Sequence, residues 1–497
     1  MKISVVAGNP LAQQSGILFV FVTQQAADKS FTQTATLKKL DHQLKGLLFE
    51  QLDKEKFKGG ADDAKILFTR GLAPYDYIAI VGLGDKKKVD VEKLRRAAAR
   101  LPALANANHA GKVTVDVDEA HVGRFSVSEL AQAVVEGLRL SSYQFSRYKK
   151  AKETFLKEVV FITAKTAHVA NLEKGVIRAE LLSEAVCLAR DLVNGSGADI
   201  TPKVLADTAL KCQGVKVKVH DLSAIKKMKM GAFLSVAKGS TVNPPYFIEM
   251  HYTPKGHAKK KVAIVGKGVT FDSGGYSLKP AKSMETMKDD MSGAATVISL
   301  MSVISRLKPD IQVSGYVAAT ENMIDGGAQR PGDVCTAMNG TTIEVLNTDA
   351  EGRLTLADAL HYANQNNPDY LIDMATLTGA CLVSLGMLYS GIMGNDQKLI
   401  NGLIAAGKYA GENIWHLPLP EEYKSQIKSD IADLKNIGGQ YGGTLTAGLF
   451  LQDFVGKTKW AHLDIAGPAF AESTSAYTQK GGTGVMIRTL SKFLDEL

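Results

Sequence analysis

The sequence predicts an α/β protein made of two α/β domains, with mixed sheets flanked by helices, joined by a linker helix. Short apolar runs typical of buried strands alternate with segments of helical periodicity. The 497 residues exceed the usual size of one domain, and 45% apolar residues suffice for two buried cores. A long helical segment separates a first part without motifs from a second part that is rich in them. We therefore expect an N-terminal domain over residues 1–165, a linker helix over 166–192 and a second domain over 193–497.

The N-terminal domain is expected to contain five strands and two helices. Each predicted strand is a short run rich in β-branched and aromatic residues, and each helix has apolar residues at helical spacing. The strands are predicted at residues 2–6, 17–22, 77–81, 113–117 and 159–163, and the helices at 91–106 and 128–137. The helical pattern of the linker extends from residue 171 to residue 192.

Two lysines and an aspartate follow a predicted strand of the second domain. The apolar run 261–265 predicts a buried strand, and Lys267, Asp272 and Lys279 then alternate with glycines in a predicted loop. Because ligands in open α/β sheets bind at the carboxyl ends of strands, this loop is a candidate site.

A second polar group lies further downstream, where residues 347–354 read N-T-D-A-E-G-R-L. Asp349 and Glu351 are two residues apart, so in an extended segment their carboxylates point the same way. Gly352 allows a turn, and Arg353 opens a predicted helix. These groups suit a hard cation with an anionic intermediate beside it. A helix with acids in its first turn is an equal alternative for this segment taken alone.

A third acidic segment precedes the predicted helix that carries apolar residues over 294–304. Either Asp289 or Asp290 can be explained as a helix cap, and the sequence does not decide which of them binds a ligand. Clustered acids repel one another in a desolvated pocket unless cations neutralise them. Two divalent metals bridged by shared carboxylates solve that problem and give a hydrolytic centre. The carboxylates expected there are Asp272, Asp290, Asp349 and Glu351.

These stretches resemble the signature of the leucyl aminopeptidase family, the two-zinc M17 peptidases, including the bacterial aminopeptidase A type. The specific matches are the octapeptide at 347–354 and V-G-K-G-V-T-F-D-S-G-G, which begins at Val265. Residues 374–380 (M-A-T-L-T-G-A) and 460–467 (W-A-H-L-D-I-A-G) match as well. The resemblance extends from near Val186 to the C-terminus, and it implies a cytosolic aminopeptidase acting on the N-terminal bond of short peptides.

The resemblance also implies two divalent metal ions per subunit, Mn²⁺ or Zn²⁺, with Mg²⁺ as a further candidate. One would be held by Asp272, Asp349 and Glu351, with the backbone carbonyl of Asp349 as a further ligand. The second would be held by Lys267, Asp272, Asp290 and Glu351. A lysine can serve as a ligand only when deprotonated, which adjacent metal charge favours.

In the same resemblance, Lys279 would polarise the scissile carbonyl, and Arg353 would hold a bicarbonate ion that acts as the general base. A guanidinium suits that task because it binds a planar oxyanion through two hydrogen bonds. Apolar and small residues would line the substrate pocket, consistent with leucine or methionine at the substrate's N-terminus. The substrate-binding residues implied are Lys279, Asp290, Met287, Thr376, Leu377, Gly379 and Ala466.

Assembly and location are expected from the same comparison and from composition. Family members are hexamers of two stacked trimers, so we expect a homohexamer with closed symmetry. The four cysteines show no paired spacing, and no apolar run is long enough to cross a membrane, which fits a cytoplasmic protein. The competing hypothesis is a DNA-binding architectural or regulatory protein with the peptidase site as a secondary activity. A net charge of +8 neither supports nor excludes it.

Overall fold

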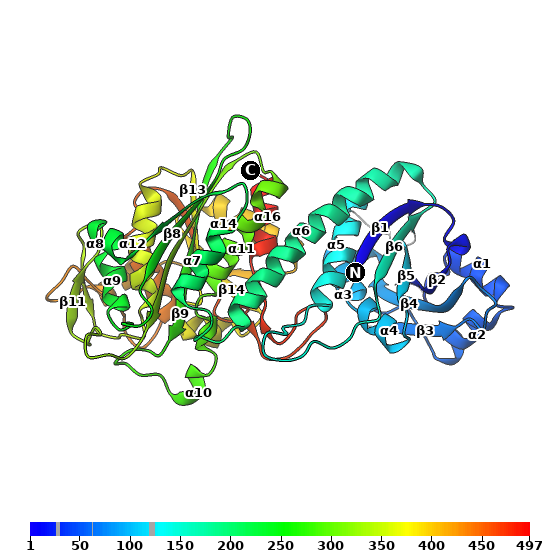
Figure 1. The fold of residues 1–497 in the computed structure, drawn as a ribbon, viewed down its shortest axis with the longest axis horizontal. Helices are drawn as coiled ribbons and strands as arrows, with labels where there is room; N and C mark the ends of the chain where they lie inside the picture. The colour runs from blue at the N-terminus through cyan, green and yellow to red at the C-terminus, as the bar shows by residue number, and fades with distance from the viewer. Residues whose placement is uncertain (26–29, 62, 119–124) are drawn as a thin grey trace. The chain divides into compact units, whose positions relative to one another are not determined.

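The computed structural model describes residues 1–25, 30–61, 63–118 and 125–497. They divide into two compact units, drawn in Figure 1. The first contains Met1–Ser183 and Thr474–Gln479, and the second contains Glu184–Ser473 and Lys480–Leu497. Each unit is built on a mixed sheet with helices beside it, so the predicted fold class is confirmed.

The first unit has a six-stranded sheet with the order β1-β6-β5-β2-β4-β3. The edge strand β3 runs antiparallel to β4, whereas the other neighbours pair in parallel. The five predicted strands are confirmed, and β3 was not predicted. The strands are β1 (Lys2–Ala7), β2 (Ser15–Gln24), β3 (Ala64–Phe68), β4 (Tyr75–Asp85), β5 (Lys112–Asp116) and β6 (Glu158–Thr163).

The helices of the first unit confirm one prediction and correct another. Helix α5 (Val127–Ser141) agrees with the predicted helix at 128–137. The single helix predicted over 91–106 is wrong, because the segment forms α3 (Val91–Ala98) and α4 (Leu101–Ala107). Pro102 lies in the first turn of α4, where a proline is tolerated, but inside one continuous helix it would remove a hydrogen bond and clash with the preceding turn.

Two further helices, α1 (Ala35–Gln43) and α2 (Leu47–Lys54), were not predicted, and they pack against apolar residues of β2 and β4. The predicted linker helix is present as α6 (Val169–Asn194), two residues longer at each end. The division between the two units falls inside α6, after Ser183.

The second unit has an eight-stranded sheet with the order β15-β14-β17-β13-β9-β10-β8-β7. Its four central strands, β17, β13, β9 and β10, are parallel, so their carboxyl ends lie at one edge. The strands are β7 (Lys216–His220), β8 (Tyr246–Tyr252), β9 (Lys261–Asp272), β10 (Gln312–Asn322), β13 (Tyr370–Ala375), β14 (Tyr389–Gly394), β15 (Asn413–His416) and β17 (Lys459–Asp464). Two smaller sheets are formed by β11 (Asp333–Thr336), β12 (Thr342–Val345) and β16 (Leu434–Lys435), and by β18 (Phe470–Ala471) and β19 (Gly481–Gly482).

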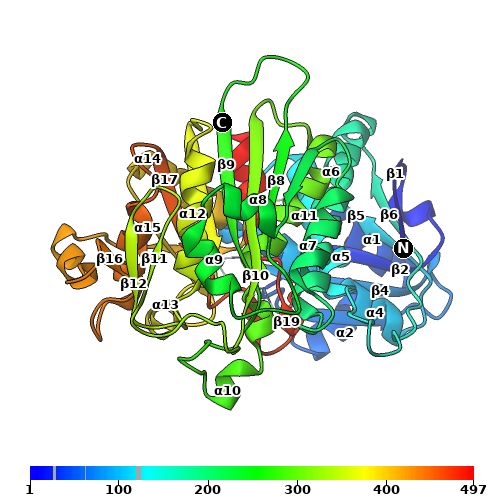
Figure 2. The ribbon, with the colours of Figure 1, turned by 60° about the vertical axis from the view of Figure 1, so that its left-hand side comes forward.

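Helices cover both faces of this sheet, as Figures 1 and 2 show for α9 and α12 on one side and α7 and α11 on the other. Apolar side chains of α9, α12 and α15 form a continuous core with β9, β10 and β13. Both faces are therefore covered, and the carboxyl edge of the central strands remains available for a site. The helices are α7 (Pro202–Leu210), α8 (Leu222–Lys227), α9 (Gly231–Ala237), α10 (Ala281–Met284), α11 (Ser292–Leu307), α12 (Gly352–Asn364), α13 (Gly379–Leu385), α14 (Gln397–Ala410), α15 (Gly443–Gln452) and α16 (Ile487–Asp495).

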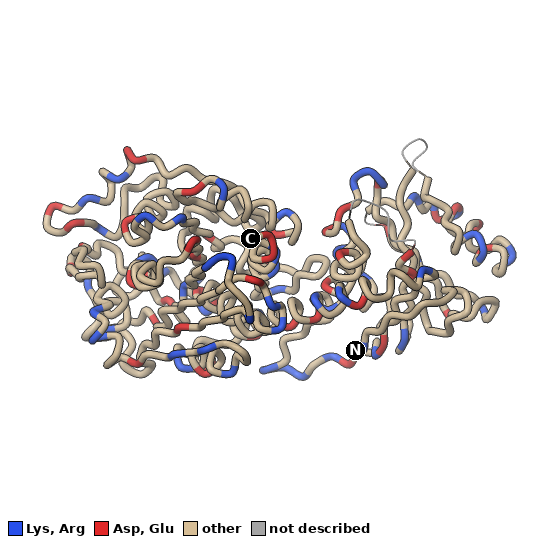
Figure 3. The backbone as a smooth tube through the Cα atoms, turned by 90° about the horizontal axis from the view of Figure 1, so that it is seen from above, with Lys and Arg blue, Asp and Glu red and all other residues tan. Residues whose placement is uncertain are grey.

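Basic and acidic residues are interspersed along the described parts of both units, as Figure 3 shows. A DNA-binding surface would require a gathering of lysine and arginine on one face. The distribution of charge along the described residues gives no support to the DNA-binding hypothesis. Among the helices of the described ranges, none combines the length and the apolar character needed to cross a bilayer.

Candidate active site

The three sequence motifs of the second unit meet at the carboxyl edge of its central strands. β9 ends at Asp272, which lies beside Asn322 at the end of β10. Glu351 is the residue from which α12 begins, and Asp290 lies between a 3₁₀ turn and the start of α11. Strand order and helix starts thus bring together side chains that are far apart in the sequence.

Lys267 lies within β9, and its side chain passes Gly352 to reach two carboxylates. A Cβ atom on Gly352 would lie 2.4 Å from Lys267 Cε, so a larger residue there would displace the Lys267 side chain. Lys267 Nζ lies 2.6 Å from Asp290 Oδ1 and 2.8 Å from Glu351 Oε1. Burial opposes the positive charge, but the surrounding carboxylates outweigh burial and raise the pKa of Lys267.

Lys279 forms a second pair of ionic contacts on the other side of the cluster. Its Nζ lies 2.8 Å from Asp272 Oδ2 and 2.5 Å from Asp349 Oδ1. The loop that carries Lys279 turns at Gly274, whose φ of +85° favours glycine, and the Lys279 amide donates to the Ser273 carbonyl at 3.0 Å. The loop therefore returns toward the end of β9 and holds the ammonium group over Asp272.

The carboxylates Asp272, Asp290 and Glu351 each offer an oxygen atom within 4.8 Å of the others. Asp290 Oδ2 and Glu351 Oε2 are buried and have no hydrogen-bond partner among the described residues. Burial, together with the neighbouring carboxylates, raises the pKa of Asp272 and of Asp290. Unsatisfied buried carboxylate oxygens in such a group fit a divalent cation. Asp349 is not part of this group of three.

Of the two adjacent acids left open by the sequence, Asp290 joins this group. The hydroxyl of Thr376 also donates to Asp290 Oδ1 at 2.8 Å. Asp289 also lines the cavity but is not part of this group of carboxylates, and burial raises the pKa of its carboxyl to about 7. The structure therefore favours Asp290 as the candidate ligand.

Asn322, which the sequence reasoning missed, fixes the orientation of the Asp272 carboxylate. Its side-chain amide donates to Asp272 Oδ1 at 2.8 Å and to the Thr348 carbonyl at 3.0 Å. The Gly274 amide donates to the same Asp272 oxygen at 2.8 Å. Asn322 thus joins the end of β9 to the segment that carries Asp349. Its position at the end of β10, the strand next to β9 in the sheet, is the feature of the sequence by which Asn322 could have been predicted.

Arg353 lies in the first turn of α12 with its guanidinium at the cavity. Its Nη1 donates to the Asn436 carbonyl at 2.7 Å, whereas its buried Nε has no hydrogen-bond partner among the described residues. Burial lowers the pKa of Arg353 to about 10, which leaves the guanidinium charged at neutral pH. A buried, charged guanidinium group with an N–H that has no partner among the described residues is suited to bind a planar anion. Asn436 is a second residue that the sequence reasoning missed.

One cavity of about 840 Å³ is lined by all the predicted site residues except Glu351. Glu351 is fully buried and does not line the cavity, although it remains paired with Lys267. Thr378 and Lys480, which were not predicted as site residues, also line it, and so does Asp289, the other of the two adjacent acids. The predicted residues that line the cavity are Lys267, Asp272, Lys279, Met287, Asp290, Asp349, Arg353, Thr376, Leu377, Gly379 and Ala466.

Comparison with known proteins agrees with this arrangement. The family model described as "Cytosol aminopeptidase family, catalytic domain" matches residues 187–491, and the N-terminal domain model of that family matches residues 17–152. A probable cytosol aminopeptidase of Persephonella marina is 43% identical over 460 residues, which cover 92% of each chain. The chain belongs to the cytosol aminopeptidase family.

One further relative and two solved structures are also similar to this chain. The probable cytosol aminopeptidase of Aquifex aeolicus is 43% identical over 446 residues, 88% of each chain. A mutant of tomato leucine aminopeptidase superposes with a TM-score of 0.88 at 33% identity, covering 100% of this chain and 97% of that one. The bottromycin maturation enzyme BotP in complex with Mn superposes with a TM-score of 0.84 at 32% identity, covering 97% and 99%.

Membership confirms the resemblance first indicated by the octapeptide at 347–354. The catalytic-domain model spans every residue of the ionic cluster, from Lys267 to Arg353. The chain is therefore a hydrolase of the aminopeptidase class. The metal ligands, the general base and the substrate-side residues remain predictions. They are supported by the cavity, which all of them except Glu351 line, and by the grouping of Glu351 with Asp272 and Asp290.

Proposed function

We propose that the chain is a two-metal aminopeptidase that removes apolar N-terminal residues, such as leucine or methionine, from short peptides in the cytoplasm. The observation that carries this proposal is the group of buried carboxylates, two of them with an unsatisfied oxygen, at the side of a cavity whose lining includes Lys267, Lys279 and Arg353. The location is supported by the names of the relatives, which are cytosol aminopeptidases.

Two metal ions would share the ionic cluster. Asp272, Asp349 and Glu351 would hold one ion. Asp290 and Lys267, the latter only after losing the proton that its carboxylate neighbours now stabilise, would hold the second together with Asp272 and Glu351. When bound, the metals supply Lewis acidity that activates water and the peptide carbonyl, and they anchor the free α-amine of the substrate. Mn²⁺ or Zn²⁺ is proposed, with Mg²⁺ as a further candidate, because oxygen-rich sites discriminate weakly among such ions. BotP, a structural neighbour, is known in complex with Mn.

Lys279 and Arg353 would provide the charges that act on the substrate. The Lys279 ammonium, held by Asp272 and Asp349, would donate a hydrogen bond to the developing oxyanion of the scissile carbonyl. Arg353 would hold a bicarbonate ion as the general base, and its unpartnered Nε and its place at the cavity support that role. Burial around both groups excludes water and strengthens these interactions.

The rest of the cavity is suited to an apolar N-terminal side chain. Met287, Leu377 and Ala466 contribute apolar surface, and a Cβ added to Gly379 would meet no atom within 4 Å, so there is open space beside it. A volume of about 840 Å³ accommodates a short peptide, not a folded protein. These features support a preference for leucine or methionine.

We also propose a homohexamer made of two trimers. Several large apolar side chains are exposed on the single chain, among them Val383 (87%), Leu388 (73%) and Trp415 (58%). Exposed apolar residues that gather in one region are typical of protein interfaces. Light scattering should report about six times the chain mass of 53.3 kDa. A fully active monomer would contradict the assembly and leave the chemistry untouched.

Metal removal and a panel of aminoacyl anilides test the proposed chemistry. Dialysis against a chelator should abolish hydrolysis of leucyl and methionyl anilides, and Mn²⁺, Zn²⁺ or Mg²⁺ should restore it. Asp290→Asn should lose bound metal, whereas Asp289→Asn, the matched change one residue away, should retain it. Full activity of verified metal-free protein, or equal metal loss in both variants, would reject the proposed centre.

A variant of Arg353 separates the general base from the metal ligands. Arg353→Ala should retain both metals and turn over about 10²–10⁴-fold more slowly, as expected for a lost general base. Added bicarbonate should stimulate the wild type and not the variant. If metal content falls in parallel with activity, Arg353 has a structural role instead.

A further inference from the structure

Asp464 is a fully buried carboxylate beside the active site, and the proposed chemistry does not use it. It ends β17 within the segment 460–467, which the family resemblance singled out without giving it a role. It lies neither in the group of candidate metal ligands nor on the lining of the cavity. Because burying a carboxylate is costly, its contacts need an explanation.

Among the described residues, the Asp464 carboxylate accepts three hydrogen bonds, and all three donors belong to residues that line the cavity. Oδ1 accepts from the backbone amides of Leu377 and Ala466, each at 3.2 Å. Oδ2 accepts from the Thr378 hydroxyl at 2.7 Å. Leu377, Thr378 and Ala466 all line the cavity. One side chain therefore binds two turns of the chain, which follow the adjacent parallel strands β13 and β17.

The contact with Thr378 extends this effect into α13. Thr378 is the N-cap of that helix, and its hydroxyl oxygen also accepts a hydrogen bond from the Cys381 amide at 3.1 Å. The first residue of α13 is Gly379, which is part of the cavity wall. The position of Thr378 therefore determines where α13 begins, and the first residue of this helix, Gly379, faces open space in the proposed side-chain pocket.

A carboxylate suits this place because several donors converge on it. The turns after β13 and β17 leave backbone amides that need acceptors, and an ionised carboxylate can accept hydrogen bonds on both oxygens. Burial raises the pKa of Asp464, whereas His462 and the hydrogen bond from Thr378 oppose that rise. An uncharged side chain of the same size would satisfy fewer of these donors.

We propose that Asp464 is a positioning residue that sets the width of the side-chain pocket by holding Leu377, Thr378 and Ala466 in place. It thereby determines selectivity among substrates with different N-terminal side chains. This inference rests on the proposed function, because it concerns the same cavity.

Asp373 provides a matched control on the neighbouring strand. It is fully buried on β13, and its two oxygens are occupied by Trp460 Nε1 at 2.6 Å and His462 Nδ1 at 2.6 Å. Neither partner lines the cavity. Asp373→Asn therefore removes a buried charge close to Asp464 without releasing a residue of the pocket.

The test compares kcat and KM on leucyl, methionyl, phenylalanyl and alanyl anilides for the wild type, Asp464→Asn, Thr378→Val, Thr378→Ser and Asp373→Asn. In Asp464→Asn and Thr378→Val, the preference for leucyl over alanyl anilide should fall by about 10-fold or more, the effect expected of a lost pocket contact. KM for the leucyl substrate should rise, and metal content should stay at the wild-type level. Thr378→Ser keeps the hydroxyl and should retain the wild-type preference. Asp373→Asn should lower thermal stability and leave the preference unchanged.

Each of three results would overturn the inference. They are an unchanged preference in Asp464→Asn, an equal loss of preference in Asp373→Asn, and a loss of preference in Thr378→Ser as large as in Thr378→Val. If Asp464→Asn does not fold, the Thr378→Val and Thr378→Ser pair gives the same decision. Failure of the proposed function is a separate outcome, because a metal-loaded wild type would then hydrolyse none of the four anilides.

Discussion

Replacing Asn322 with alanine should weaken metal binding without removing any proposed ligand. The buried Asn322 amide donates to Asp272 Oδ1 at 2.8 Å and to the Thr348 carbonyl at 3.0 Å. Alanine removes both hydrogen bonds, so the Asp272 carboxylate loses one of the groups that orient it. Loss of a residue that orients a metal ligand typically reduces metal affinity or activity by about 10–100-fold, equivalent to roughly 1.4–2.8 kcal/mol.

The assay is a titration of chelator-treated protein with Mn²⁺, followed by activity on leucyl anilide. Half-maximal reactivation of Asn322→Ala should need about 10–100-fold more metal than the wild type, with activity approaching the wild-type level at saturation. Thr320→Val is the matched control, because Thr320 is buried two residues earlier on β10 and its hydroxyl donates to the neighbouring Glu321 carbonyl, away from Asp272. An unchanged titration for Asn322→Ala, or an equal shift for Thr320→Val, would refute the reasoning.

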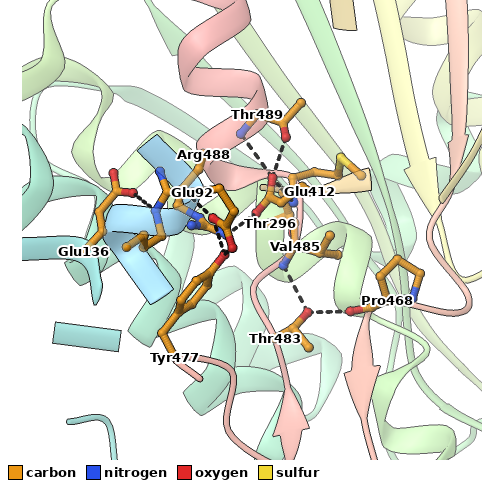
Figure 4. Close-up of polar contacts among 12 residues, drawn as sticks. Glu92, Glu136, Thr296, Glu412, Pro468, Tyr477, Thr483, Val485, Arg488 and Thr489 are labelled. Atoms are coloured by element: carbon orange, nitrogen blue, oxygen red, sulfur yellow. Dashed lines mark hydrogen bonds and ion pairs between the residues drawn. The ribbon is translucent and has the colours of Figure 1, made fainter. Parts of the chain in front are cut away.

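Two further predictions concern stability. Glu412 is buried and accepts hydrogen bonds from the backbone amide (3.2 Å) and the hydroxyl of Thr489 at the start of α16 (Figure 4). Glu412→Gln should therefore reduce the free energy of unfolding by about 1–3 kcal/mol in chemical denaturation, and an unchanged midpoint would show that the contact contributes little. Burial alone would raise the pKa of Glu249, but hydrogen bonds from His251 and His220 outweigh it and lower the pKa to about 2. Its ionised form is thus favoured by folding, so stability present above pH 4.5 should be lost as the pH falls toward 2, and Glu249→Gln should flatten that part of a stability profile.

Much of the fold could be predicted because strand patterns and helix periodicity are local signals. The five predicted strands of the first unit are rich in β-branched and aromatic residues, and all five are present. The missed strand β3 has only five residues and lies at the edge of the sheet, where an apolar pattern is short. The break between α3 and α4 was marked by Pro102, and the apolar spacing of the segment obscured that signal.

The candidate ligands could be predicted for a different reason. Parallel strands place their carboxyl ends at one edge, so acids that follow separate strands are expected to meet there. Asn322, Asn436 and Asp464 were not predicted as site residues because their contribution depends on tertiary contacts. Asn322 binds a carbonyl 26 residues away, and Asp464 binds an amide 87 residues away. No spacing pattern in a single sequence distinguishes such residues from other polar residues at strand ends.

These three residues share one property that bears on how the activity can vary. Each side chain bonds to the backbone of a segment that carries a proposed reactive or substrate-binding group. Asn322 donates to the carbonyl of the residue before Asp349, Asn436 donates to the carbonyls of Asn347 and Ala350 on either side of Asp349, and Asp464 accepts from the pocket wall. None of the three is itself a proposed metal ligand. Substitutions at such positions shift geometry and leave the chemistry of the ligands intact, so they affect affinity or selectivity before they abolish turnover. Enzymes with the same octapeptide at 347–354 can therefore differ in substrate preference, and the determinants should be sought among the residues that hold the turns.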